Sequence, residues 1–346
     1  MPDAAQASSP SAAAALARLR RRPEAWLFGV IVLAVAVFGA AAPGFLTLPN
    51  AIDLLETYSV QAIMAMGLFV VLVSGGIDIS FAATASVSQY VAALLAARLG
   101  LPAPLVVALG LSVGTALGCL NAALIHFVRI PSIIATIAMM SVTFSLLMYF
   151  SGGRSIYDLP DWWTTRVTFY ETETASGDLV RVTLPIVAMI AVSLGTWALM
   201  TRSSVGRQLY AMGGNAEAAR RIGMRIGRLQ FVAYGFLGLL AALAGLLQAH
   251  RVGESVPNAM VNTELAVLSA AVLGGASLTG GIGTVPGVLL GIVLLAILQN
   301  GLNLLGVSSY FFQIVIGLTI LASTSLTVLS SRRGRRHRTL GEAAHA

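Results

Sequence analysis

The chain contains no lysine, and all 21 of its basic residues are arginines. A nucleotide-binding P-loop needs a lysine that reaches the phosphates, so a standard P-loop site is excluded. If ATP drives this chain, a partner protein has to hydrolyse it. Charge is also scarce, because 10% of the residues are charged and 57% are apolar, with a mean hydropathy of +0.85. This composition is outside the range of soluble domains and is typical of polytopic membrane proteins.

Cysteine and clustered ionisable residues are scarce as well. The single cysteine, Cys119, lies within an apolar run, so a disulfide within the chain is excluded and a small buried side chain is expected. Asp78 and Glu264 lie at the edges of apolar runs, and the runs lack the series of carboxylates or histidines found in proton- or sodium-coupled carriers. No catalytic pattern such as Ser-His-Asp or paired carboxylates predicts an enzyme. We assign no metal site, because the four histidines lack ligand spacing: His126, His250, His337 and His345.

Ten apolar runs predict an all-α polytopic membrane protein with about ten transmembrane helices. A helix needs ~20 apolar residues to cross the hydrocarbon layer, so the shorter runs indicate tilted, broken or re-entrant segments. We expect residues 26–330 to form one transmembrane domain between tails at 1–25 and 331–346. A cleavable signal peptide would have a similar basic start and small residues near Ala40, but the later spans make a retained first span sufficient. The runs are Trp26–Ala42, Ser59–Val73, Phe81–Ala97, Ala103–Val128, Pro131–Phe150, Leu184–Met200, Leu229–Ala249, Glu264–Leu278, Val285–Leu305 and Tyr310–Leu329.

The arginines that flank these runs predict the orientation of the chain. With ten spans and both ends inside, 16 arginines lie inside and five lie outside, namely Arg98, Arg154, Arg166, Arg181 and Arg251. The positive-inside rule then makes both termini and the polar segment 201–228 cytoplasmic. The acidic loop 151–183 faces outward, and its Trp162-Trp163 pair suits a membrane–water interface. Because the charge follows the membrane flanks, the net charge of +7 does not indicate a nucleic-acid partner.

Small and polar residues indicate how the helices meet. Glycines recur every four residues on two helix faces, where we expect close helix packing: Gly110, Gly114 and Gly118 on one, Gly287 and Gly291 on the other. Uncharged polar groups within the runs predict hydrogen bonds between helices: Gln89, Asn121, Gln248, Gln299, Asn300 and Asn303. Gln299 and Asn303 share one helix face. An uncharged, hydroxyl-rich substrate would need the same kind of lining, so a transport path remains an open interpretation.

Two stretches in opposite halves of the chain are similar: Val71–Ala85, VLVSGGIDISFAATA, and Val272–Pro286, VLGGASLTGGIGTVP. Each ends an apolar run in Gly-Gly, adds a flexible turn and begins another apolar run. Paired interruptions are typical of transporters built from repeats and often lie along the transport path, although two glycine-rich turns also match by chance. The candidate gate or path residues are Gly75, Gly76, Asp78, Ser80, Gly274, Gly275, Gly280, Gly281, Gln299 and Asn303.

The polar segment Thr201–Arg228 predicts a short capped helix. Gly213-Gly214 can turn the chain, and Asn215 can cap the amide groups of a new helix. Glu217 lies in the first turn, where the helix dipole favours an anion. The alanines that follow favour helix, and Gly223 is placed to end it after about two turns. A helix of this length is not stable alone, so the segment is either a docking surface or an ordinary solvated loop.

The same residues resemble a motif of ABC-importer permeases of the ribose and other monosaccharide type, within the wider branched-chain and sugar permease family. The motif in the polar segment is matched by Gly206-Arg207, Tyr210, Gly213-Gly214-Asn215, Glu217, Ala218-Ala219-Arg220 and Gly223. Gly75-Gly76-Ile77-Asp78-Ile79-Ser80 matches a second motif except that Ile79 stands where leucine is usual. Phe81-Ala82 departs from the Val-Gly that usually follows. Gly274–Gly283 matches a third motif, so the resemblance covers roughly residues 45–330.

The resemblance implies a transport subunit and not an enzyme: the permease of a monosaccharide importer in a bacterial inner membrane. Segment 213–223 would seat in a groove of a cytoplasmic ABC ATPase subunit through Gly213, Gly214, Asn215, Glu217, Ala218, Ala219, Arg220 and Gly223. That ATPase would bind ATP and Mg²⁺, and we expect no cofactor in this chain. Other partners would be a periplasmic sugar-binding protein, a second permease chain, identical or different, and membrane lipid. Two alternatives stay open: cargo such as a nucleoside, a branched-chain amino acid or a sugar-like signal molecule, and a stand-alone secondary carrier or channel.

Overall fold

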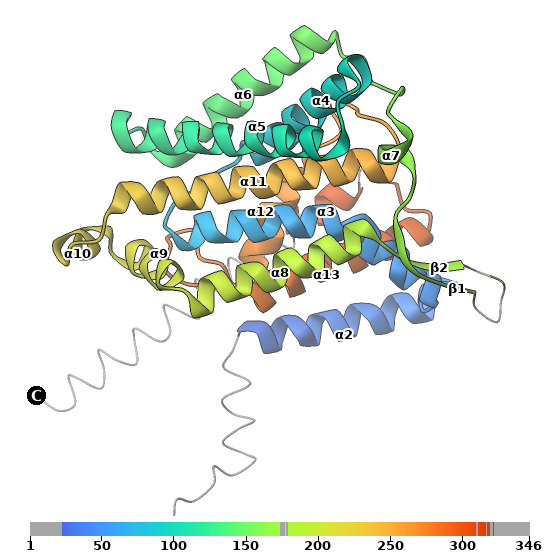
Figure 1. Ribbon diagram of the computed structural model, residues 1–346. Helices are drawn as coiled ribbons and strands as arrows, with labels where there is room; N and C mark the ends of the chain where they lie inside the picture. Colours follow the sequence, from blue (N-terminus) through green and yellow to red (C-terminus); the bar gives the residue numbers. More distant parts are fainter. Residues whose placement is uncertain are drawn as a thin grey trace, which may run out of the picture.

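The computed structural model describes residues 23–173, 177, 179–308, 311–315, 317–318 and 321. Most of them form helices that run side by side (Figure 1), and this confirms the prediction of an all-α polytopic membrane protein. The long helices are α2 (Pro23–Ala41), α3 (Leu48–Val73), α4 (Phe81–Leu99), α5 (Ala103–Ala123) with its π-helical extension η1 (Leu124–Val128), α6 (Ser132–Ser151), α8 (Leu184–Arg202), α11 (Ile226–Val252) and α13 (Val285–Leu304).

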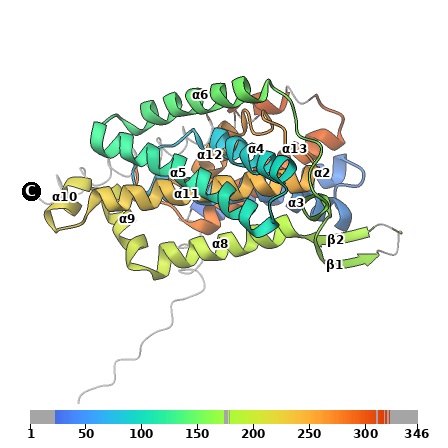
Figure 2. The same cartoon turned by 45° about the horizontal axis from the view of Figure 1, so that its top comes forward.

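The bundle has two distinct ends. The short helices α9 (Ser204–Gly214) and α10 (Ala216–Arg221) lie at one end, and a β-hairpin lies at the other, in both views (Figures 1 and 2). We call these the α10 end and the hairpin end. Among the described arginines, those that the sequence places inside lie at the α10 end: Arg129, Arg202, Arg207, Arg220, Arg221, Arg225 and Arg228. Most of the two predicted tails lies outside the described residues.

Helices α3 and α11 form the centre of the bundle. In α3, 89% of the most apolar 18-residue stretch is buried inside the protein, compared with 17% of the corresponding stretch in α2. Both central helices are apolar on all sides, which is the pattern of a helix surrounded by other helices. α11 packs on α3, α4 and α5. The outer helices α2, α5, α6 and α8 leave apolar side chains exposed, as lipid-facing helices do.

The predicted glycine faces do bring helices close together. A Cβ atom on Gly114 would lie 2.5 Å from the Gly238 carbonyl oxygen of α11, and one on Gly118 would overlap the Tyr234 carbonyl. On α13, Gly287 and Gly291 approach the short helix α12 (Thr263–Leu273) in the same way. These contacts confirm that small residues set the helix packing.

Seven helices among the described residues are long and apolar enough to span a membrane, judged by length and composition: Glu24–Ala41, Leu48–Val73, Ala103–Val128, Ser132–Ser151, Leu184–Arg202, Ile226–Val252 and Val285–Leu304. α4 has 19 residues, but its serines, threonine and glutamine make it less apolar. α12 has 11 residues and rises only about 16 Å, so it is a broken span of the kind that the sequence predicts. The last run, Tyr310–Leu329, falls mostly outside the described residues.

Loop 151–183 contains secondary structure that the sequence does not reveal. Helix α7 (Asp161–Thr164) is followed by the antiparallel strands β1 (Thr168–Glu173) and β2 (Leu179–Thr183). The two tryptophans of this loop differ in burial. Trp163 is 4% exposed and packs inside the protein, where its indole nitrogen donates to the Leu246 carbonyl, whereas Trp162 is partly exposed. The Trp163 indole therefore anchors the loop to α11.

Candidate functional site

Helix α10 has the caps that the sequence predicts. Asn215 has extended backbone angles, and its side-chain oxygen accepts from the Ala218 amide at 2.9 Å. At the other end Gly223 has φ +87°, a left-handed conformation that glycine adopts without strain. The Gly223 amide bonds to the Arg220 carbonyl and the Met224 amide to the Ala219 carbonyl, which is a Schellman ending.

The charged face of α10 is open to solvent. Glu217 pairs with Arg221, one turn further on, at 3.3 Å, and both side chains are well exposed. Arg220 is also exposed, whereas Ala219 is buried against the rest of the end. The helix therefore presents a carboxylate and two guanidinium groups outward while one alanine holds it in place. An exposed pair of this kind adds little stability, so its charges are available to a partner.

The sequence prediction for Gly213-Gly214 is wrong. These residues do not turn the chain, because α9 continues through both of them and the turn comes at Asn215. Gly213 is instead a point of close approach. A Cβ atom there would overlap the Val73 carbonyl and would lie 2.6 Å from the Gly281 amide nitrogen. Gly214 has nothing within 4 Å of its Cβ position, so the two glycines differ in what they require.

Three glycine segments meet at Gly213, although they lie far apart in the sequence. The Gly281 amide donates to the Val73 carbonyl at 2.9 Å, which links the turn after α12 to the end of α3. A Cβ atom on Gly280 would lie 2.7 Å from both the Gly213 carbonyl oxygen and the Gly75 Cα atom. We call Gly75, Gly213, Gly280 and Gly281 the glycine contact. It is a backbone-to-backbone junction between α9 and both interrupted turns.

Tyr210 adds a side-chain bond to the same junction. Its hydroxyl donates to the Gly283 carbonyl at 2.8 Å and so links α9 to the turn before α13. Burial raises the pKa of Tyr210 above its ordinary value, so the hydroxyl keeps its proton and stays a donor. The aromatic position could be found from the sequence motif, but its partner could not, because the two residues are 73 positions apart.

The two interrupted turns have the same local geometry. After α3, the Gly75 amide bonds to the Leu72 carbonyl and the Gly76 amide to the Val71 carbonyl. After α12, the Gly275 and Ala276 amides make the equivalent pair of bonds. Gly75 and Gly275 have φ +87° and +90°. Both helices therefore end in the same Schellman turn, so the similarity of the two stretches extends to their local backbone structure.

Asp78 holds the first turn to its neighbours. It is 2% exposed, and its carboxylate accepts from the Ser80 amide and hydroxyl, each at 2.7 Å, and from the Asn121 side chain at 3.1 Å. The Ile77 amide donates to the Ser132 hydroxyl of α6 at 3.1 Å. Neutral donors from Ser80 in the same turn and from Asn121 of α5 thus satisfy the buried carboxylate. Asn121 stands out in the sequence as a polar residue in an apolar run, but nothing there connects it with Asp78.

Gln299 and Asn303 lie away from the glycine turns. α13 begins near the α10 end, and both residues are in its last turns, at the hairpin end. Gln299 accepts a hydrogen bond from the Tyr58 hydroxyl of α3, and the neighbouring Asn300 exchanges two bonds with Asn50. The predicted path residues therefore form two separate groups, because the part of α13 between Val285 and Gln299 rises about 21 Å. The helix-linking interpretation of the in-span amides is confirmed for Gln299 and Asn300.

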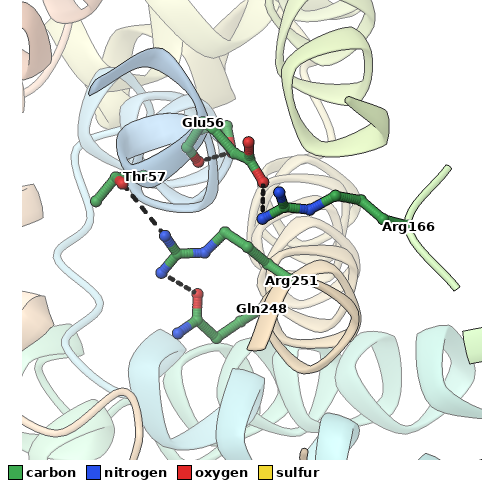
Figure 3. A network of polar contacts seen from close by, with 6 residues as sticks. Glu56, Thr57, Arg166, Gln248 and Arg251 are labelled. Carbon is green, nitrogen blue, oxygen red and sulfur yellow. Dashed lines mark hydrogen bonds and ion pairs between the residues drawn. The ribbon is translucent and has the colours of Figure 1, made fainter. Parts of the chain in front are cut away.

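The hairpin end has its own polar network (Figure 3). Arg166, just before β1, pairs with Glu56 of α3 at 3.4 Å. Arg251 of α11 donates to the Thr57 hydroxyl at 3.3 Å and to Gln248 at 3.1 Å. The network joins α3, α11 and the start of the hairpin. Arg166 fixes the start of the hairpin on α3, and Arg251 links α3 to α11.

Comparison with known proteins shows the family. Residues 50–324 match the model described as branched-chain amino acid transport system / permease component. The chain is 34% identical over 302 residues to the ribose import permease protein RbsC of Escherichia coli K12, covering 85% of this chain and 90% of that one. It is 30% identical to the D-allose transport system permease protein AlsC of the same strain, over 88% of this chain and 91% of that one. It is 28% identical to the galactose/methyl galactoside import permease protein MglC of the same strain, over 90% of this chain and 95% of that one. The chain therefore belongs to this family of transport-system permease components.

Proposed function

We propose that the protein is the membrane-spanning permease of an ABC importer that carries a monosaccharide across a bacterial inner membrane. The observation that carries the proposal is the glycine contact, which joins the α9–α10 segment directly to the ends of α3 and α12. A movement of α10 imposed from outside would reach both interrupted turns through backbone contacts, without a flexible side chain between them. This is what a subunit driven by a separate ATPase requires.

In this proposal the α10 end is cytoplasmic and the hairpin end is periplasmic. The arginine distribution supports the orientation, because Arg129 and the arginines between Arg202 and Arg228 all lie at the α10 end. Ten spans with both termini inside agree with the seven apolar helices, the less apolar α4, the broken α12 and the partly described last run. Helix α10 would seat in a groove of the ATPase subunit, and the hairpin end would receive a periplasmic sugar-binding protein.

The ATPase subunit would bind ATP and Mg²⁺, and two permease chains would share two ATPase domains. Relatives named for ribose, allose and galactose import support a monosaccharide as cargo. The family description names branched-chain amino acids, so these are the second candidate cargo, together with nucleosides and sugar-like signal molecules. A stand-alone carrier is less consistent with the structure, because the α9–α10 segment would then have no partner.

The proposal is tested by co-expressing the chain with an ATPase subunit and a binding protein encoded by neighbouring genes, if these are present, and reconstituting the purified complex in liposomes. ATP hydrolysis and uptake are then measured with ribose, galactose, allose, a nucleoside and leucine. Stimulation by one of the sugars supports the proposal. Stimulation by leucine or a nucleoside would keep the transporter class and change the cargo. ATP-independent uptake by the chain alone would refute the proposal.

A further inference from the structure

A small cavity with a polar wall lies between α4, α6 and the segment that precedes α12. It has a volume of about 320 Å³. The polar residues that line it come from three elements: Ser86, Ser141, Ser145, Asn262 and Glu264. Ser141 and Ser145 are one turn apart on α6, so both face the same side. None of these residues belongs to the glycine contact or to the network at the hairpin end.

The cavity lies near the middle of the membrane-spanning bundle. α12 ends at the α10 end, and its 11 residues rise about 16 Å, so Asn262 and Glu264 at its start are about halfway across a hydrocarbon layer of about 30 Å. The chain reaches this depth without helix, over residues 253–262. Gln89, in the middle of α4, donates to the Val256 carbonyl at 2.8 Å, which places that segment at the same depth.

Polar groups at this depth cannot face lipid. Non-helical backbone is tolerated in a bilayer where it lies against protein or lines a water-filled cavity, and an ionisable side chain there is costly. Yet Ser141, Ser145 and Asn262 are exposed on the single chain. The Ser86 hydroxyl is buried and has no hydrogen-bond partner among the described residues. Asn262 also has φ +67°, a left-handed conformation that asparagine adopts more readily than most residues with a side chain.

We propose that this cavity is where the permease contacts the sugar as it crosses the membrane. This inference rests on the proposed function and adds the site to it. A monosaccharide offers several hydroxyl groups, each a donor and an acceptor. The Glu264 carboxylate accepts from such hydroxyls, the Asn262 amide and the serines both donate and accept, and Ser86 gains the partner that it lacks. Because the lining contains no arginine, the site suits a neutral sugar and not a sugar phosphate.

The first test measures whether the cavity is wet, and it needs no sugar. Cys119 is the sole cysteine, so Cys119→Ala gives a cysteine-free chain. In the complex with its ATPase, Ser145→Cys is compared with Val142→Cys, an exposed position on α6 that does not line the cavity. A charged, membrane-impermeant thiol reagent reacts with the thiolate, so S145C should react about tenfold faster or more. Equal, slow labelling of the two would show a lipid-filled or dry cavity and would overturn the proposal.

The second test measures transport. Glu264→Gln is compared with Leu265→Ala, its exposed neighbour that does not line the cavity. E264Q replaces a carboxylate oxygen by an amide group and should lower uptake by about tenfold, whereas uptake by L265A should stay unchanged. Both variants should reach wild-type levels in the membrane and co-purify with the ATPase as the wild type does. Normal uptake by E264Q would contradict the proposal, and so would loss of its assembly. If the wild-type complex transports none of the sugars, the proposed function fails while the labelling result still stands.

Discussion

Gly213 and Gly214 are neighbours in α9, but only Gly213 lacks space for a side chain. Gly213→Ala would force the new methyl group into the Val73 carbonyl, whereas Gly214→Ala adds a methyl group to open space. We expect Gly213→Ala to lower the free energy of unfolding by about 1–3 kcal/mol, because overpacking forces the backbone to shift. The shift should separate α9 from the turn at Gly280. Uptake and ATP hydrolysis stimulated by the binding protein should both fall in the reconstituted complex.

Gly214→Ala is the matched control for that change. Alanine favours helix over glycine by about 1 kcal/mol, so this variant should be at least as stable as the wild type and should transport normally. Thermal unfolding in detergent and uptake at equal membrane levels would be measured for both variants. If both alanine variants behaved alike, the glycine contact would not transmit motion.

The cap and charge of α10 lead to a second prediction. Asn215→Ala removes the bond to the Ala218 amide and should cost the helix about 1 kcal/mol. Glu217→Arg places a cation at the positive end of the helix and removes the pair with Arg221. Neither side chain contacts a membrane span, so the double variant should reach the membrane at normal levels. We expect weaker co-purification of the ATPase and loss of sugar-stimulated ATP hydrolysis, whereas a merely solvated loop would leave uptake normal.

At the scale of elements, helices could be predicted from the sequence more readily than contacts between them. Asn215 and Gly223 are local signals, and they define α10 because capping acts within one turn. The glycine faces on α5 and α13 also act locally, through the spacing of small residues. The pairing of Gly213 with Val73 and Gly281 could not be predicted, because it depends on how distant segments fold together. The hairpin in loop 151–183 could not be predicted because its strands have only six and five residues and lie within a polar loop.

The two ends of the bundle give a third prediction. Thr165, in the loop at the hairpin end, and Ser204, at the start of α9, are both exposed. In a Cys119→Ala background, Thr165→Cys should react with a membrane-impermeant thiol reagent in intact spheroplasts, and Ser204→Cys only after permeabilisation. The expectation follows from the arginines at the α10 end. Labelling of both from the same side would refute the proposed orientation.

At the scale of the whole molecule, composition was sufficient for the class of protein, since few charged residues and ten apolar runs leave little besides a polytopic membrane protein. The number of spans does not follow from composition alone, because α4 is less apolar than the other long helices and α12 is short. The sequence predicts one transport path that includes Gln299, Asn303 and the glycine turns, because polar residues within a span and interrupted turns are both typical of transport paths. In the fold Gln299 and Asn303 lie at the hairpin end and the glycine turns lie at the α10 end. Gln299 links α13 to α3. A polar residue in a span does not reveal from the sequence which helix it faces.

The last prediction concerns what drives transport. The chain lacks a lysine for a P-loop. Asp78, a carboxylate buried at the end of a span, is occupied by neutral donors from Ser80 and Asn121, which favours a structural role over a proton relay. The chain purified alone and placed in liposomes should therefore neither hydrolyse ATP nor accumulate sugar under an imposed proton or sodium gradient. Adding the ATPase subunit and the sugar-loaded binding protein should start both ATP hydrolysis and uptake. Accumulation driven by either gradient in the chain alone would identify a secondary carrier, and the α9–α10 segment would then need another explanation.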